Sequence, residues 1–426
     1  MGVPAGAAGA QLRWLLSATG QLPVADAQVT AHFDTAFLGG ASTAGASTAG
    51  ISAGVNEALQ AVPAARLVSI QISELNTVAA LVSAAGTRAQ VWLTVDRQGL
   101  ISGLRISPVA TGPDPATWAG VDAELRTVAP QVRLLVADVG NGACQPVHSI
   151  DAGTPAPVGA VFKLYVLDAL GNAAASGAVR WDQPLTVTAQ VKSLPAGELQ
   201  ADPDGTQTSV LDTAAAMMSL SDNTATDMLI NLVGRPAVEA ALTSTGMASP
   251  ALDLPLLTTR EIFTLKLSQW PALADRYLAA DEPGRQALLN STVDRAPLPA
   301  TAAAADWTSP REINRLEYFA SPGDLCRAYA DLATLARQPG LAPIGQLLSV
   351  NDDGLGLNPA QWQTIWFKGG SEPGVLAMAF LATTRTGHSY VVTALAANPA
   401  QSIDESVATP AMLSAVRAAF TLAARP

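Results

Sequence analysis

The sequence predicts an α+β protein with two domains, one over residues 1–110 and a larger one over residues 115–426. At 426 residues the chain is long for a single hydrophobic core. Residues 107–116 contain three prolines and a glycine, a composition typical of a linker. In the larger region the predicted strands lie near both ends with helices between them, which favours a sheet assembled from distant segments.

Composition indicates a globular protein and excludes two classes of partner. Hydrophobic residues make up 49% of the chain and charged residues 14%, enough to bury a core. The net charge of −11 and the isoelectric point near 4.7 are the opposite of the basic surface that nucleic acid or an anionic membrane attracts. No apolar run is long enough to span a membrane, and the first eleven residues lack the basic start of an export signal, so we expect a cytoplasmic protein.

Cys144 and Cys326 are the only two cysteines. Their spacing matches no metal-ligand or redox motif, so the sequence predicts two buried free thiols and no disulfide framework. Nothing in the sequence implies a metal or an organic cofactor, and nothing indicates an oligomeric state.

The first domain is predicted to begin with helices and end with strands. Helical apolar spacing predicts two helices within residues 9–38. After residues 39–54, rich in Gly, Ala, Ser and Thr, alternating residues predict a β-hairpin with strands at Arg88–Val95 and Leu100–Ile106. This order resembles the small α+β cone of cystatin-like or nuclear-transport-factor-like (NTF2-like) domains.

The second domain is predicted to begin and end with segments of one sheet. In order, the predicted elements are a helix at residues 116–127, a strand at Val132–Val139, a strand ending near Ile150, a helix at Ala160–Ala175, strands at Trp362–Phe367, Val375–Thr383 and Tyr390–Ala396, and a helix at Met412–Ala424.

The helix that starts at Ala160 carries Lys163 in its first turn. Residues three apart share a face of a helix, so positions 160 and 163 lie side by side. Taken alone, such a lysine is more often a solvated charge than a catalytic group. Two later motifs change that interpretation.

The first of these is Ser221-Asp222-Asn223, which follows Ala160 by 61 residues. Ser, Asp and Asn all begin helices well, so the bare tripeptide would be interpreted as an N-cap. The second is Lys368-Gly369-Gly370-Ser371 on a predicted strand, 147 residues after Ser221. Each motif is weak alone, and their order within one domain makes them specific.

In this order the three motifs resemble the Ser-x-x-Lys, Ser-Asp-Asn and Lys-Thr-Gly elements of class A β-lactamases and penicillin-binding D,D-peptidases. The resemblance implies a β-lactamase-like second domain, with an antiparallel sheet flanked by helices and an all-helical part. The two-domain order is similar to the β-lactamase-like proteins of clavulanic acid biosynthesis clusters. It implies a serine hydrolase that acts by acyl-enzyme chemistry on an ester or amide of a β-lactam-related metabolite.

The same resemblance implies a role for each residue. Position 160, if serine, would attack the carbonyl, and Lys163 would take the proton. Ser221 would pass a proton to the leaving group.

Lys368 is implied to be catalytic as well, supplying positive charge for a substrate carboxylate and for proton transfer. Asn223 would bind an amide of the substrate. The backbone N–H groups of residues 160 and 371 would form an oxyanion hole beside Gly370.

Three departures from the family pattern bear on activity. Ala160 has no nucleophilic atom, so either a serine at this position was deliberately replaced by alanine, or the protein is a natural non-catalytic descendant. The other site residues are present, which favours deliberate replacement. Residues 306–315 lack the family's Glu-x-x-Leu-Asn, so the deacylating glutamate is predicted to be absent. Three other glutamates are weak substitutes for it and are expected to be exposed helix carboxylates: Glu261, Glu312 and Glu317. Gly369 stands where the family has a hydroxyl residue that helps to bind a β-lactam carboxylate.

Residues 255–305 are an insertion, interpreted as a helical cap over the site. The leading hypothesis is therefore a cephalosporin-type esterase or weak β-lactamase whose nucleophile is replaced. The alternative hypothesis is a non-catalytic protein that binds the same kind of metabolite. A third hypothesis places the function in the first domain.

Overall fold

A computed structural model of the chain describes residues 3, 7–35, 37–38, 52–73, 77–96, 98–108, 113–194, 197, 199–300, 303, 307–350 and 352–425. It divides into two compact units, Met1–Pro113 and Asp114–Pro426. Parts of the predicted features lie outside the described residues: 109–112 of the linker, 39–51 of the small-residue stretch, and 301–302 and 304–306 at and beyond the end of the insertion. No helix in the described part of the chain has both the length and the apolar character needed to cross a membrane.

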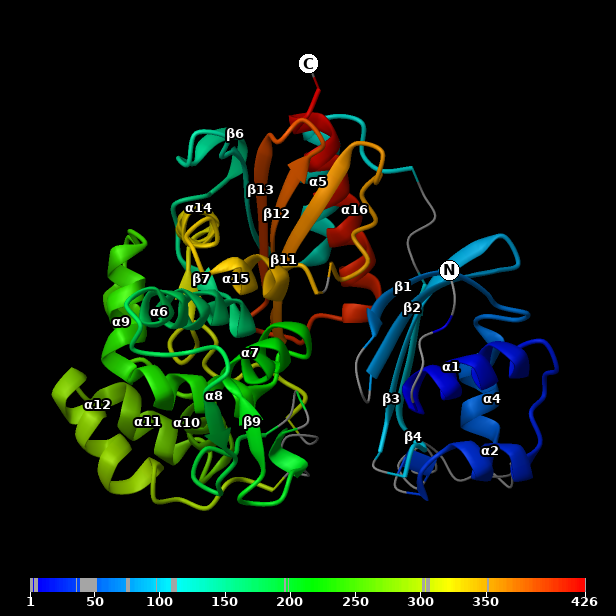
Figure 1. Cartoon of the computed structure of the whole chain (residues 1–426), viewed down its shortest axis with the longest axis horizontal. Coiled ribbons are helices and arrows are strands. Elements are labelled where there is room, and N and C mark those ends of the chain that lie inside the picture. Colours follow the sequence, from blue (N-terminus) through cyan, green and yellow to red (C-terminus); the bar gives the residue numbers. More distant parts are fainter. Residues whose placement is uncertain are drawn as a thin grey trace. The chain divides into compact units, whose positions relative to one another are not determined.

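The first unit is a four-stranded antiparallel sheet with helices packed on it (Figure 1). Its elements are α1 (Ala7–Ala18), α2 (Asp26–His32), α4 (Ala53–Gln60), β1 (Arg66–Ser73), β2 (Thr77–Ala84), β3 (Thr87–Val95) and β4 (Ile101–Pro108). Leu12, Leu15 and Phe33 pack in its core against Val91 and Leu93 of the sheet. The predicted helices and the β3–β4 hairpin are present, whereas β1 and β2 were not predicted. The likeness to cystatin-like or NTF2-like domains stays a prediction.

The second unit contains a five-stranded antiparallel sheet built from both of its ends, as predicted. The strands, in spatial order, are β11 (Trp362–Glu372), β12 (Val375–Thr384), β13 (Ser389–Ala397), β5 (Gln131–Asp138) and β6 (Gln145–Ile150). Side chains alternate between its two faces. Met378 and Phe380 therefore pack against α5 (Trp118–Val128) and α16 (Glu405–Ala423), while Ala379 and Leu381 join the core on the other face.

The opposite face of the sheet carries the helical part of the unit (Figure 1). Its helices are α6 (Lys163–Ala175), α7 (Val210–Ser219), α8 (Asn223–Val233), α9 (Arg235–Ser244), α10 (Thr259–Leu267), α11 (Ala272–Ala279), α12 (Glu282–Leu288), α14 (Pro322–Leu335) and α15 (Ala342–Leu348), with short turns η1 (Gly159–Phe162), η2 (Leu199–Ala201), η3 (Pro250–Asp253) and η4 (Leu289–Val293). Two short pairs, β7 (Ala156–Pro157) with β10 (Phe319–Ala320) and β8 (Pro184–Thr186) with β9 (Gln207–Ser209), complete it.

The predicted insertion is helical, because α10, α11 and α12 lie within it. Asp227 of α8 accepts hydrogen bonds from the backbone N–H groups of Thr259 and Arg260 at 2.8 and 2.9 Å, which fixes the start of α10. These first N–H groups have no partner inside their own helix, so a buried carboxylate satisfies them. The insertion is thereby attached to the helix that begins at Asn223.

The prediction of two free thiols is wrong. Cys144 and Cys326 form a disulfide, with their Cα atoms 6.2 Å apart. It ties the segment before β6 to α14 across 182 residues of sequence. The sequence offers no spacing rule for so distant a pair, because only the packing of α14 against the sheet brings the two residues together.

Candidate active site

The short helix η1 places Ala160 directly against β11. A Cβ atom on Gly370 would lie 2.3 Å from Val158 O and 2.5 Å from Ala160 N, so only glycine permits this approach. A Cβ atom on Gly159, which has φ +50°, would lie 3.3 Å from the backbone N of Ser371. The backbone nitrogen atoms of residues 160 and 371, the predicted oxyanion donors, thus belong to one contact between η1 and β11.

Lys163 is the first residue of α6, and its side chain is fully buried. Its Nζ atom donates to the backbone O of Ser221 at 2.5 Å, to Ser221 Oγ at 3.1 Å and to Asn223 Oδ1 at 2.8 Å. The lysine was predicted to act from a helix start, and the structure brings it to the second motif.

Lys368 approaches the same serine from β11. Its Nζ atom donates to Ser221 Oγ at 3.0 Å and to the backbone O of Gly369 at 2.7 Å, and its side chain is only 3% exposed. Ser221 itself is half-buried, while Ser371 is exposed. Ser221 Oγ therefore lies between two buried amines, on a residue that is only half-buried.

Burial lowers the pKa of both amines. The pKa of Lys163 is well below its ordinary value because the side chain is desolvated and because the Lys368 charge is close, and Asp222 and Asp227 offset only part of this. Desolvation lowers the pKa of Lys368 to about 7, against a smaller opposing effect of Asp353. A neutral amine is consequently available beside Ser221 near neutral pH.

The turn between α7 and α8 holds the Ser-Asp-Asn motif. Asp222 is the N-cap of α8: it accepts from the backbone N of Ala225 at 2.8 Å and from the backbone N of Leu199 at 2.9 Å. Asn223 donates from Nδ2 to the backbone O of Leu194 at 3.0 Å and accepts from Lys163. The N-cap interpretation thus holds for Asp222, while the side chains of Ser221 and Asn223 contact the lysines.

A second buried lysine cluster was not predicted from the sequence. Lys266 Nζ lies 2.9 Å from Glu317 Oε2 and 2.6 Å from Glu372 Oε1, and the lysine side chain is fully buried. Burial would lower the pKa of Lys266, but the two carboxylates raise it above its ordinary value. Burial and the neighbouring Glu317 raise the pKa of Glu372. No sequence spacing links these residues, which come from α10, the segment before β10, and the end of β11.

The expectation that the substitute glutamates are exposed helix carboxylates is wrong, because none of the three is exposed and only Glu261 lies on a helix. Glu261 is 2% exposed, accepts from Arg235 at 2.6 Å, and forms a capping box with Thr258 at the start of α10. Glu317 is bound to Lys266, and Glu312 is half-buried. Tertiary packing of the insertion against the segment before α14 buries carboxylates that an isolated helix would expose.

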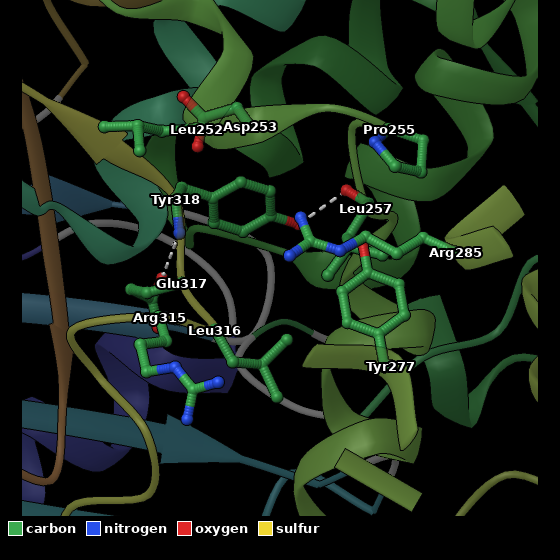
Figure 2. A pocket seen from close by; sticks show the side chains of 10 residues that line it. All are labelled: Leu252, Asp253, Pro255, Leu257, Tyr277, Arg285, Arg315, Leu316, Glu317 and Tyr318. Carbon is green, nitrogen blue, oxygen red and sulfur yellow. Dashed lines mark hydrogen bonds between the residues drawn. The ribbon is translucent and has the colours of Figure 1, made fainter. Parts of the chain in front are cut away.

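A separate pocket lies between the insertion and the segment before β10 (Figure 2). It is lined by Leu252, Asp253, Pro255, Leu257, Tyr277, Arg285, Arg315, Leu316, Glu317 and Tyr318. The Tyr318 hydroxyl donates to the backbone O of Leu257 at 2.8 Å, and its ring stacks on Phe162 of η1 at 3.5 Å between centroids. None of the residues predicted from the motifs lines this pocket.

Among the described residues, no group of three or more His, Cys, Asp or Glu side chains is arranged to hold a metal ion.

Comparison with known proteins gives a family and a fold. The model of the beta-lactamase enzyme family matches residues 121–415. A solved β-lactamase from Sphaerobacter thermophilus is 19% identical, with a TM-score of 0.51 over 72% of this chain and 98% of that one. A solved β-lactamase from Chitinophaga pinensis is 16% identical, with a TM-score of 0.49 over 72% of this chain and 98% of that one. No curated protein sequence matches the chain.

Proposed function

Because the chain belongs to the beta-lactamase enzyme family, we propose that its site carries out acyl transfer on an ester or amide of a β-lactam-related metabolite. One observation supports this most directly: Ser221 Oγ accepts hydrogen bonds from the amines of both Lys163 and Lys368. Amines whose pKa is lowered toward neutrality can take and return protons during attack on a carbonyl.

Substrate binding follows from the contact between η1 and β11. In the proposal, the substrate carbonyl lies at the backbone N–H groups of residues 160 and 371, which stabilise the negative charge that develops on its oxygen. Lys368 supplies positive charge for a substrate carboxylate, and Ser371, three residues further along β11, is exposed. Gly369 lacks the hydroxyl that would add a second contact, so a penicillin carboxylate is held less firmly than in the family pattern.

Esters are the better substrates in this proposal. The carboxylates that could activate a deacylating water, Glu261 and Glu317, are buried and bound to Arg235 and Lys266. A lactam acyl-enzyme therefore turns over slowly, whereas ester cleavage makes smaller demands on such a base. A role in clavulanic acid-type biosynthesis rests on the two-domain order alone.

The alternative function is reversible binding of such a metabolite without chemistry. One observation favours it: Ala160 occupies the position from which the family's serine attacks, on the short helix that contacts Gly370.

The disulfide bears on where the protein works. Disulfides persist in oxidising compartments and are rare in a reducing cytosol. The bond between Cys144 and Cys326 therefore favours an oxidising compartment over the cytoplasmic location expected from the sequence.

The test restores the hydroxyl. The Ala160→Ser variant and the unmodified chain are incubated with benzylpenicillin, a cephalosporin, clavulanic acid and 4-nitrophenyl acetate, and intact mass and product release are recorded. The proposal expects an acyl adduct or product with the serine variant, and the mass distinguishes lactam opening from ester cleavage. If the variant neither labels nor turns over any of them while both proteins bind a ligand equally, the binding function replaces it.

A further inference from the structure

We propose that Ser221 is the nucleophile of this chain: its Oγ atom attacks the carbonyl carbon of an ester or lactam and carries the acyl group. The inference rests on the proposed acyl-transfer function and goes beyond it, because the family resemblance gave Ser221 only a proton-passing role. Position 160 holds no hydroxyl, yet both lysine amines are hydrogen-bonded to the hydroxyl of Ser221.

The geometry that activates a serine is present at Ser221. A serine becomes nucleophilic when a base within about 2.6–3.2 Å can take its proton. Ser221 Oγ has two such neighbours, Lys163 Nζ at 3.1 Å and Lys368 Nζ at 3.0 Å. Both amines are buried, and burial favours the neutral form. Neutral Lys163 keeps two protons, for the backbone O of Ser221 and for Asn223 Oδ1, and its lone pair faces the Ser221 hydroxyl across the 3.1 Å contact, so there the hydroxyl donates to the amine.

The backbone holds Ser221 in an uncommon conformation. Its φ is +55°, a left-handed value that a residue with a Cβ atom seldom adopts. Two hydrogen bonds to Asp222, from Ala225 N and Leu199 N, fix the following residue. Such strain persists where the surroundings impose it and is concentrated at functional sites. Here it accompanies a hydroxyl that lies between the two lysines, on a residue that is only half-buried.

The reaction balances without any further reagent. As the bond from Oγ to the carbonyl carbon forms, neutral Lys163 takes the hydroxyl proton. The resulting ammonium returns that proton to the leaving oxygen or nitrogen as its bond to the carbonyl carbon breaks. Water then attacks the acyl carbon, a lysine amine takes a proton from the water, and Ser221 Oγ leaves and is reprotonated. Serine with a lysine base is an established variant of nucleophilic catalysis.

The assignment also explains why both lysines contact one hydroxyl. If residue 160 carried the nucleophile, Ser221 would only pass protons between that residue and the two amines. Without a hydroxyl at position 160, Ser221 is the hydroxyl that both amines reach, and the inference keeps the carbonyl oxygen at the backbone N–H groups of residues 160 and 371, which meet where η1 contacts β11.

The experiment labels the full chain, with Ala at position 160, with 4-nitrophenyl acetate and with benzylpenicillin. Samples are quenched in acid at times from milliseconds to hours, and the modified peptide is identified by mass spectrometry. We expect the acyl group on Ser221, formed faster as the pH rises, because Lys163 must be neutral to take the hydroxyl proton and its pKa is lowered by burial and by the Lys368 charge.

Matched variants complete the test. Ser221→Ala should slow acylation by at least about 100-fold, the scale of a lost catalytic group. Ser176→Ala, which removes an exposed serine at the other end of α6, should label normally. Ser221→Cys keeps a nucleophile and should form a thioester at position 221, which guards against a folding defect in the alanine variant.

The outcomes separate this inference from the proposed function. If Ala160→Ser is acylated at position 160 while the unmodified chain is not acylated at Ser221, the inference is overturned and the function stands. An adduct on another residue of the unmodified chain, unchanged in Ser221→Ala, also overturns it. If neither protein forms an adduct or releases product, the function and the inference fail together.

Discussion

Two clusters in the second unit bury lysines with opposite consequences. Lys163 and Lys368 surround the Ser221 hydroxyl, and their pKa values are lowered. Lys266 lies between Glu317 and Glu372, and its pKa is raised. All three amines are almost completely buried, so burial alone does not decide their charge. The partners decide it: two carboxylates raise the pKa of Lys266, while the hydroxyl, amide and carbonyl oxygens around the other two amines do not offset the effect of burial, and the Lys368 charge lowers the pKa of Lys163 further.

The two clusters share one face of β11. Lys368, Gly370 and Glu372 alternate along the strand and point the same way. Ala160, against Gly370, therefore contacts β11 between the Lys266 cluster and the cluster of Lys163 and Lys368. We interpret the ionic cluster as a structural tie between α10, the segment before β10 and β11, and the other as the reactive part of the site.

The largest expected difference concerns the loss of a lysine. Lys266→Met leaves two carboxylates buried without their cation and should reduce the free energy of unfolding by about 3–5 kcal/mol. Lys163→Met removes an amine that is already costly to bury. The free energy of unfolding should therefore fall by at least about 2 kcal/mol less than in Lys266→Met. Urea unfolding of the two variants measures both values, and equal losses would show that the clusters do not differ in kind.

The next largest effect is expected from loss of the disulfide, which should affect the two lysine clusters differently. Reduction, or replacement of Cys144 and Cys326 by alanine, should lower the free energy of unfolding by about 2–4 kcal/mol. Since Cys326 lies on α14, directly after the segment that carries Glu317, we expect hydrogen exchange to rise in that segment and to change less around Ser221. Equal changes in both regions would contradict this assignment.

A smaller effect is the dependence of stability on pH. Folded Lys368 loses its proton at about pH 7, whereas an unfolded lysine keeps its proton until about pH 10. The unfolded chain therefore binds more protons across this window, and stability rises with pH by up to about 1.4 kcal/mol per unit. Lys368→Met should show a smaller rise when unfolding is compared at several pH values within the window, because Lys163, whose pKa is also lowered, then contributes alone. Parallel curves for the two proteins would mean that Lys368 stays charged when folded.

Much of the fold was predictable because its signals are local. The strands that became β11, β12 and β13 follow from apolar runs, and the helix after Ala160 from helical spacing. In the first unit, β2 was missed because Thr77–Ala84 is rich in alanine, which has weak strand preference.

The site was predictable only where its residues form motifs. Lys163, Ser221 and Lys368 were identified from motif order and lie together. The pairing of Lys266 with Glu317 and Glu372, like the disulfide, joins residues far apart in sequence and depends on tertiary packing alone.

The charge of each lysine can be measured directly, because the chain contains only four: Lys163, Lys192, Lys266 and Lys368. Protein labelled with carbon-13 at the lysine Cε atoms gives one signal per residue, assigned by single Lys→Arg replacements and followed by NMR during a pH titration. We predict that the Lys368 signal titrates near pH 7, that the pKa of Lys163 is also well below the ordinary lysine value, and that the pKa of Lys266 lies above it. If Lys163 and Lys368 instead titrate with Lys266 at or above the ordinary value, neither amine can accept the Ser221 proton near neutral pH, and the account of the site is wrong.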